Sequence, residues 1–373
     1  MIRRTILTAI IVCCAWLPAV AGDTVTPAAK VRQFNIREND STTYILNLAL
    51  DDAGRPLYYF RNIFTPVCYT GECKPVYINF YWDLLGNYER FDLPGKEVLT
   101  KLDHREFKKA DYEKLQEILA KPNSILADLK MEDLIVPGTE NLTDSVDART
   151  GATLKTIKNE VIEGAVYTCY TLWHLAYGQV TDEILKITET YNDNQLLHNF
   201  LSGDNHHYQY WAMERVMDKQ GNVTSGFEAD IRKIISGKNI FIARYALQKV
   251  NNSFLQDNAA QEWLWHTYGD AAYPLQLTVL KKLANISISN KLAERVSTNL
   301  SGANPEQFRL LLAVLAAQKI LSAKVTEKMA AYLENGDTTY AGEIYRVLKQ
   351  RPVNHAIKKK LSDYEHKNNQ TTD

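Results

Sequence analysis

The second half of the chain repeats a pattern of apolar residues about every 33 positions, and this repeat constrains its fold more than any other feature. One series, with separations of 34, 33, 32 and 33 residues, consists of Met213, Leu247, Leu280, Leu312 and Tyr345. A second series between them, with separations of 33, 32, 33 and 32, consists of Ile231, Leu264, Val296, Met329 and Leu361. Two apolar stripes per period predict stacked helix-turn-helix units. The glycines taken as breakers between the helices are Gly221, Gly237, Gly269, Gly302 and Gly336.

This pattern resembles that of HEAT-like α-solenoids. The period also suits a tetratricopeptide array, but the Trp, Gly and Pro landmarks of that repeat do not recur. Because such units bury their apolar faces only against neighbours, we expect one all-α helical-repeat domain over residues 179–366, followed by a disordered tail over 367–373. The resemblance implies a surface for a protein partner. The alternative that the repeats merely pack on the first half stays open.

Residues 31–92 alternate between apolar and polar side chains in the manner of strands. The segments richest in β-branched and aromatic residues are 44–48, 57–60 and 76–82, with turns at 51–54 and 83–86. A helix over 110–119 follows, with Tyr112, Leu115, Ile118 and Leu119 on one face. We therefore expect an α+β first domain over residues 22–178, with a mixed or antiparallel sheet and helices.

The N-terminus has the features of a secretory signal peptide. Two positive charges within residues 1–4 precede an apolar run over 5–17, and small residues follow at 19–21. The run is shorter than the roughly 20 residues that a membrane anchor requires, and no later stretch is long and apolar enough to cross a membrane. We expect residues 1–21 to be removed and the chain to be exported to the periplasm or the outer cell envelope.

Three cysteines remain after such a cleavage, in a compartment where disulfides persist. Cys68 and Cys73 flank a short loop containing Gly71, so a disulfide that closes a hairpin is the favoured interpretation. Metal binding and redox chemistry are the alternatives. Cys169 lies in an apolar helical stretch, which indicates a small core residue rather than a nucleophile.

One short segment carries a chemical signature, and its sequence is Asp147-Ala148-Arg149-Thr150-Gly151-Ala152-Thr153. It resembles the Asp-x-x-(Ser/Thr)-Gly-Ala-Thr signature of FMN-binding domains, in which the last Thr is joined to the flavin phosphate through a phosphoester. The resemblance implies that Thr153 is the acceptor and that a dedicated flavin transferase supplies FMN. Upstream, the strand over 76–82 with Asp83 and Gly86 resembles the strand, turn and return strand of the same domains. The resemblance covers residues 60–178 at most.

The residues of this segment also suit a phosphate on physical grounds. Gly151 permits a tight turn, and 154–161 has helical spacing, which would set Thr153 at a helix N-terminus that favours an anion. Arg149, Lys155 and Lys158 add positive charge near the phosphate. Asp147 holds the loop or orients the Thr153 hydroxyl. The alternative is an ordinary N-capped helix start, for which Asp and Thr are also suitable.

The stretch 164–175 is apolar nearly all round, which predicts a buried helix. Its Tyr and Trp rings either stack on a flavin or pack in the core, and core packing is favoured. His174 is either a proton donor to reduced flavin or a hydrogen-bonded core histidine, and the second is preferred.

Charge and histidine spacing exclude other classes of site. A formal net charge of -1 gives no general attraction for nucleic acid or acidic lipid. The residues His198, His206, His207 and His266 have no carboxylate or cysteine at the spacing of a known metal site. We interpret them as surface or groove histidines and predict no metal.

Together these features predict an exported electron-transfer protein with FMN on Thr153 and a helical-repeat surface for a redox partner. No catalytic acid or base pair is identified, so a redox carrier is favoured over a turnover enzyme. The alternative is a non-catalytic envelope interaction protein with no bound flavin.

Overall fold

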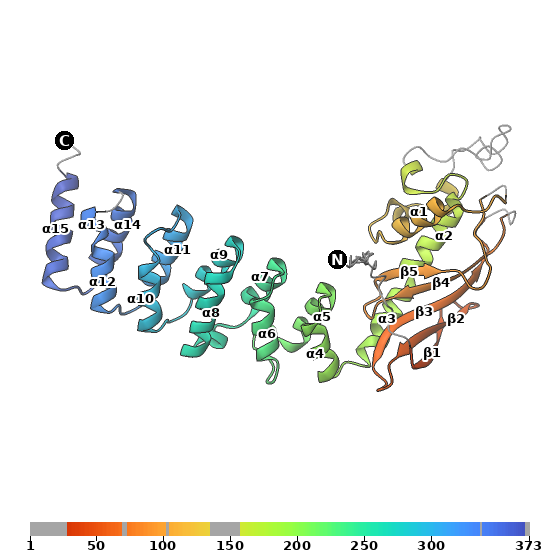
Figure 1. Ribbon diagram of the computed structural model, residues 1–373, viewed down its shortest axis with the longest axis horizontal. Helices are drawn as coiled ribbons and strands as arrows, with labels where there is room; N and C mark the ends of the chain where they lie inside the picture. The colour runs from red at the N-terminus through yellow and green to blue at the C-terminus, as the bar shows by residue number, and fades with distance from the viewer. Residues whose placement is uncertain (1–27, 69–72, 102–103, 135–156, 336–337, 370–373) are drawn as a thin grey trace, which may run out of the picture. The chain divides into compact units, whose positions relative to one another are not determined.

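The computed structural model describes residues 28–68, 73–101, 104–134, 157–335 and 338–369 (Figure 1). The chain forms two compact units, Met1–Tyr191 and Asn192–Asp373. The N-terminal 1–21, for which a signal peptide was expected, lies outside the described residues.

The first unit is built on a five-stranded antiparallel sheet in which each strand pairs with the next along the chain. The strands are β1 (Lys30–Arg37), β2 (Thr43–Leu50), β3 (Pro56–Thr65), β4 (Val76–Trp82) and β5 (Tyr88–Asp92). The three expected strand segments lie within β2, β3 and β4. The expected antiparallel sheet with helices is therefore confirmed as an α+β arrangement.

Turns with positive φ join the strands where the sequence predicted them. Gly54 (φ 81°) and Gly86 (φ 79°) have backbone that residues with a Cβ rarely adopt. The Asp83 carboxylate accepts hydrogen bonds from the backbone N–H of Leu85 and Asn87 at 2.8 and 2.9 Å. A Cβ on Gly86 would lie 3.1 Å from the carbonyl oxygen of Thr181, so this turn also packs closely on a helix.

The first unit also contains α-helices and single turns of 3₁₀ helix. These are α1 (Lys109–Leu119), η1 (Ile125–Asp128), η2 (Met131–Leu134), η4 (Lys158–Glu160), α2 (Val166–Tyr177) and α3 (Gln179–Glu189). The helix expected over 110–119 is α1, and Leu115, Ile118 and Leu119 on its inner face are buried. The structure groups α3 with the sheet, whereas the sequence analysis began the helical-repeat domain at residue 179.

One face of the sheet packs on these helices. Leu48, Tyr59 and Trp82 are cross-strand neighbours, and all three are fully buried. The Trp82 indole N–H donates to the carbonyl oxygen of Ala176 in α2 at 2.8 Å, and the Tyr59 hydroxyl lies 3.0 Å from the hydroxyl of Thr188 in α3. The sheet is therefore attached to α2 and α3 by large buried side chains whose polar ends form hydrogen bonds.

The second unit is all-helical in the residues that the structure describes. Its elements are α4 (Asn194–Ser202), α5 (His206–Val216), α6 (Glu228–Ile235), α7 (Ile240–Lys249), η5 (Asn252–Leu255), α8 (Asn258–Asp270), α9 (Tyr273–Leu283), α10 (Asn290–Thr298), α11 (Pro305–Ala316), α12 (Ala323–Ala330), α13 (Tyr332–Asn335), α14 (Thr338–Lys349) and α15 (His355–Asn369). The last helix continues to Asn369, past the expected end at 366.

Polar caps at their N-termini explain where most of these helices begin. The side-chain oxygen of the capping residue accepts a hydrogen bond from a backbone N–H of the first turn, which otherwise has no partner. The capping residues are Asp193, Asn205, Asn239, Asp257, Ser289, Asn304 and Ser322.

The helices of the second unit form two layers. Among the first helices of successive pairs, α4 contacts α6, and α8, α10 and α12 contact one another in that order. The Arg232 guanidinium of α6 lies 5.6 Å from the ring centroid of Trp263 in α8, which joins the two runs. The second helices contact one another in the order α5, α7, α9 and α11. The Phe308 ring of α11 stacks on the Tyr340 ring of α14 at 4.1 Å, so α14 continues the second layer. Each pair therefore packs on the pair before it and the pair after it (Figure 1).

The apolar series of the sequence lie at matching places in these helices. The first series falls on α5, α7, α9, α11 and α14, and its members are buried except Tyr345, which is half-buried. The second falls on α6, α8, α10, α12 and α15, where Leu361 is the half-buried member. Of the expected breakers, Gly221, Gly237 and Gly302 lie between helices, while Gly336 is outside the described residues.

Gly269 was wrongly taken as a breaker, because it lies within the last turn of α8. Tyr268 before it is buried and stacks on the Trp265 ring at 4.7 Å, so packing holds the helix through the glycine. A glycine in a helix costs only about 1 kcal/mol, which such packing readily offsets.

Two adjacent residues of α7 provide a test of this packing. Ile242 is buried at 2% exposure, whereas Phe241 is 76% exposed. We expect Ile242→Ala to lower the free energy of unfolding by about 2–5 kcal/mol, because it leaves a cavity between helix pairs. Phe241→Ala, the matched control, should change it by less than about 0.5 kcal/mol. Urea denaturation measures both; equal losses would contradict the described packing.

Candidate functional site

The residues expected to bind FMN lie outside the described residues. They are Asp147, Arg149, Thr150, Gly151, Ala152, Thr153 and Lys155, all within the stretch 135–156. What the structure does describe is the chain on either side of that stretch, and the helix on which both sides converge.

Both ends of the stretch are anchored in the core of the first unit. Leu134, the last described residue before it, is fully buried in η2, which contacts α2. Ile157, the first described residue after it, is also fully buried. A few residues later, the backbone N–H of Ile162 donates to the sulfur of Cys169 in α2 at 3.4 Å.

The helix expected over 154–161 is not present in the part that is described. Residues 157–161 contain only the three-residue η4, and Val161 has extended backbone (φ −136°, ψ 169°). Gly164 then has a positive φ of 74°. The apolar side chains of Ile157, Val161 and Ile162 are all buried, so tertiary packing rather than helical spacing explains where they occur. Lys158, expected to add charge near the phosphate, is exposed in η4.

The helix α2 lies at the centre of these anchors, and its large polar side chains bond to backbone carbonyls. The indole N–H of Trp173 donates to the carbonyl oxygen of Lys121 at 2.9 Å. The hydroxyls of Tyr170 and Tyr177 donate to the carbonyl oxygens of Leu129 and Leu119 at 3.0 and 2.6 Å. These rings therefore hold the 119–129 segment against α2, as core packing requires.

His174 belongs to the same set of contacts. Its Nε2 lies 3.0 Å from the carbonyl oxygen of Leu126, and its ring centroid is 4.3 Å from that of Tyr170. Burial lowers the pKa of His174 below its usual value of 6.5, since burial disfavours the charged imidazolium. The structure thus gives this residue the environment of a hydrogen-bonded core histidine.

Cys68 and Cys73 form a disulfide, as the sequence predicted. Their Cα atoms are 5.5 Å apart. Cys68 follows β3 and Cys73 precedes β4, so the disulfide closes the connection between two antiparallel neighbours just beyond the paired residues Thr65 and Val76. The bond tightens a turn of the sheet.

Cys169 is a free, fully buried cysteine. Burial raises the pKa of its thiol to about 12, because the apolar surroundings disfavour the thiolate. A thiol in this environment is a packing residue and a poor nucleophile.

The histidines of the second unit form no metal site among the described residues. The Nδ1 of His198 lies 2.8 Å from a carboxylate oxygen of Asp230, and its ring stacks on Phe227 at 4.3 Å. The rings of His206 and His207 lie 4.0 Å apart at the exposed start of α5.

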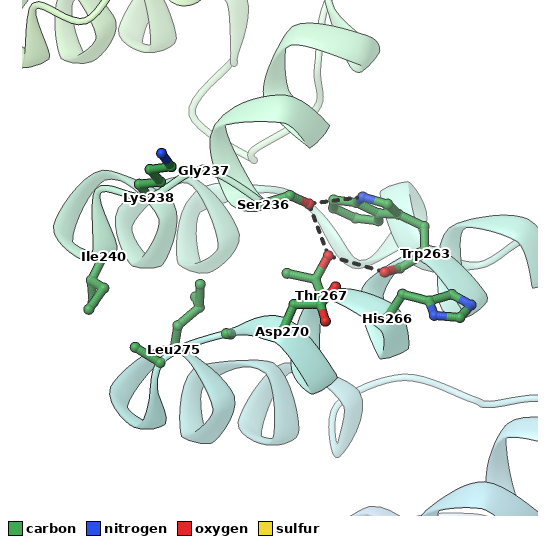
Figure 2. A pocket seen from close by; sticks show the side chains of 11 residues that line it. Ser236, Gly237, Lys238, Ile240, Trp263, His266, Thr267, Asp270 and Leu275 are labelled. Atoms are coloured by element: carbon green, nitrogen blue, oxygen red, sulfur yellow. Dashed lines mark hydrogen bonds between the residues drawn. The ribbon is translucent and has the colours of Figure 1, made fainter.

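His266 lines a cavity of about 460 Å³ between the α6–α7 and α8–α9 pairs (Figure 2). Ile240 and Leu275 provide an apolar wall. At the other wall, the Trp263 indole N–H donates to the Ser236 hydroxyl at 3.1 Å, and this hydroxyl lies 2.9 Å from that of Thr267. Because the Thr267 hydroxyl also donates to the carbonyl oxygen of Trp263 at 3.1 Å, the polar groups of this wall bond mainly to one another.

Two further cavities lie between helices of the second layer. One, of about 400 Å³, is between α7 and α9, and the other, of about 350 Å³, is between α11 and α14. The sequence predicted a partner surface on these helices, and it named Leu247 and Leu312 as members of the apolar stripe but no polar residue that lines the two cavities. The only available signal was the placement of lysines and carboxamides directly after the buried stripe, as at Gln248 and Lys281.

Comparisons with protein families, with curated proteins and with solved structures each gave no match for this chain. In the part of the chain that the structure describes, no helix combines the length and apolar character needed to cross a membrane.

We expect His174 to make stability depend on pH. Since its pKa is lower in the fold than its usual 6.5, the unfolded chain binds the proton more readily, and stability should fall as pH drops below 6.5. The variant His174→Gln keeps a hydrogen-bond donor but does not titrate. Urea denaturation at about pH 8 and about pH 5 should show a larger loss for the wild type than for the variant. Identical losses would show that His174 does not contribute.

We also expect Cys169 to resist alkylation in the native protein. Its raised pKa leaves almost no thiolate near neutral pH, and it is buried. After mild reduction, iodoacetamide should label the half-buried Cys68 and Cys73, which act as internal references, but label Cys169 only after unfolding. Peptide mass spectrometry measures the labelling. Comparable labelling of all three cysteines in the native state would contradict the described burial.

Proposed function

We propose that this chain is an exported electron-transfer flavoprotein with FMN joined to Thr153 by a phosphoester. The observation that carries the proposal is the tethering of the signature Asp147–Thr153 between Leu134 and Ile157, both buried in the first unit. Thr153 is four residues from Ile157, so covalent geometry keeps a group on its hydroxyl within about 14 Å of a core residue, plus the length of its own side chain. A cofactor there would move with the first unit.

The hairpin upstream of the signature adds support. The resemblance to FMN-binding domains includes a strand, an Asp-x-x-Gly turn and a return strand, and the chain has these elements in β4, the Asp83–Gly86 turn and β5. The close approach of this turn to α3 gives Gly86 a role beyond the turn itself.

The chain's own residues would serve attachment and tuning. Gly151 permits close approach of the backbone to a phosphate, and Arg149 and Lys155 supply positive charge for it. Asp147 would orient or hydrogen-bond the Thr153 hydroxyl. Attachment forms one P–O bond to Thr153 Oγ and releases the hydroxyl proton. A flavin transferase must therefore use a flavin nucleotide whose phosphate carries a leaving group. When bound, FMN supplies one- or two-electron transfer.

We further propose that the second unit is a HEAT-like α-solenoid that binds a protein partner in the redox chain. Among the described residues, the main contacts of each helix pair are with the neighbouring pairs, as stacked repeats require. Export to the periplasm or outer envelope is proposed from residues 1–21, and the Cys68–Cys73 disulfide suits an oxidising compartment.

A second candidate function is a non-catalytic envelope interaction protein. It is favoured by the cavities described above, which all lie in the second unit, and by the polar groups of α2, which bond to backbone carbonyls rather than facing an open site. In that case the first unit would only support the partner surface.

Loss of one hydroxyl distinguishes the two functions. We expect wild-type protein, coexpressed with a flavin transferase and exported, to show flavin absorbance and a mass increase of one FMN less one water. Thr153→Ala should lack both, because the acceptor oxygen is gone. The matched control Thr156→Ala, outside the signature, should retain both.

Intact-mass and peptide spectrometry on the 147–158 region measure this outcome. If the wild type carries no flavin under these conditions, the flavoprotein proposal is wrong and the interaction protein is favoured.

A further inference from the structure

The cavity of about 400 Å³ between α7 and α9 is lined by two lysines, whose charge favours an anion, and mostly by uncharged polar side chains. Apart from Leu247, the lining residues are Gln248, Asn252, Thr278, Lys281, Lys282 and Asn285. None of the lining residues is acidic. The cavity therefore combines two ammonium groups with carboxamides and has no carboxylate of its own to neutralise them.

Lys281 and Lys282 have no ion pair among the described residues. Lys281 is exposed, and Lys282 is half-buried with its ammonium group donating to the carbonyl oxygen of Val250. Burial lowers the pKa of Lys282, with no acidic group to oppose the effect. An ammonium group has three N–H donors, so Lys282 retains donors for a ligand in the cavity.

The carboxamides are held in place by the backbone of the repeat. Asn252 donates through Nδ2 to the carbonyl oxygen of Asn285 at 3.1 Å, and Asn285 donates to that of Lys281 at 2.8 Å. Because these bonds connect η5 to the end of α9, the cavity wall is fixed by contacts between neighbouring repeats.

A third cation lies one helical turn from a residue that lines the cavity. Arg244 is one turn before Gln248 on α7, so the two side chains share a face of the helix. The Nε of Arg244 is buried and has no hydrogen-bond partner among the described residues. This face of α7 therefore presents a guanidinium with a donor that lacks a partner among the described residues.

The second layer as a whole is positively charged. Helices α5, α7, α9, α11 and α14 contain eight lysines and arginines against three glutamates, a net charge of +5. The matched first helices α4, α6, α8, α10 and α12 contain six basic and six acidic residues, a net charge of zero. The charge of the repeat is therefore concentrated on one layer of it.

We propose that the α7–α9 cavity binds a carboxylate side chain within an extended acidic segment of a partner protein. The inference deepens the partner-binding part of the proposed function and does not require flavin. Packed helices lie about 8–10 Å apart and an extended chain rises about 3.3 Å per residue. An acidic residue at about every third position would therefore meet successive helices of this layer.

The test uses the full exported chain and a fluorescent peptide of about 12 residues with Glu at every third position. We expect saturable binding that weakens with added salt and is absent for the same peptide with Gln in place of Glu. The double variant Lys281→Gln, Lys282→Met should weaken binding at least about tenfold, because it removes both ammonium groups while keeping the side-chain stems. Lys281→Gln alone, at an exposed position, should weaken it in the same direction.

The matched control is Lys233→Gln on α6, an exposed lysine of the other layer that has no ion pair among the described residues. It should change the affinity less than about twofold. Fluorescence anisotropy measures all affinities, and circular dichroism checks that each variant is folded.

Three results would overturn the proposal: no binding of the Glu peptide, equal affinity for the double variant, or displacement of the peptide by an equal concentration of inorganic phosphate. The last would identify a small-anion site instead. The same titration on Thr153→Ala protein should give unchanged affinity, so a failure of the flavin proposal and a failure of this one are distinguished.

Discussion

The second unit depends on one constraint, that a helix pair has no interior of its own. Its apolar stripes become buried only when the next pair covers them, as at Leu247 in α7 and Leu280 in α9, both fully buried. Hydrogen bonds between neighbouring repeats fix the register of this stacking. The buried Gln261, for example, donates to the carbonyl oxygen of Ser287 and accepts from the backbone N–H of Ser289. Hydrophobic burial supplies the main stabilisation and the buried carboxamide makes the alignment specific.

In the first unit, α2 is the element on which the other parts of the core pack. Its amphipathic rings bury their apolar surface and end in hydrogen bonds to carbonyls, so that Tyr177 attaches the end of α1 and Trp173 attaches the chain just after it. The indole N–H of Trp82, in the sheet, also donates to a carbonyl of α2. This explains how a unit with several 3₁₀ turns and long connections keeps a single core.

Local sequence patterns were sufficient to predict most helices and strands. They failed where tertiary contacts determine the structure. Alternation located β4 within its observed bounds, and the turn at Asp83 was visible from Gly86. Residues 157–161 do not form the expected helix, since burial of Ile157 and Val161 on either side of a short 3₁₀ turn produces the same apolar spacing. Likewise α3 has a helical pattern, but its tertiary contacts with Tyr59 and with the Leu84–Gly86 turn place it with the sheet.

The candidate sites divide in the same way. The signature around Thr153 is a contiguous sequence motif, so it can be identified from the sequence alone, although its residues lie outside the described ones. The α7–α9 cavity could not be predicted from the sequence, because whether a lysine forms an ion pair depends on residues about one repeat away. Lys249 pairs with Glu214 across that separation, whereas Lys282 donates to the carbonyl of Val250 and has no ion pair in the described part of the chain. A one-dimensional pattern does not distinguish these two lysines.

Contact restricted to neighbouring pairs also has an evolutionary consequence. Duplication or loss of one pair would change the interfaces at the junction and leave those further along the stack in place, because each pair packs on its neighbours. Gene rearrangement can therefore lengthen or shorten the positively charged second layer by one helix pair at a time. The number of acidic residues that a partner needs would change with it. Binding strength could change in this way without any substitution in the first unit.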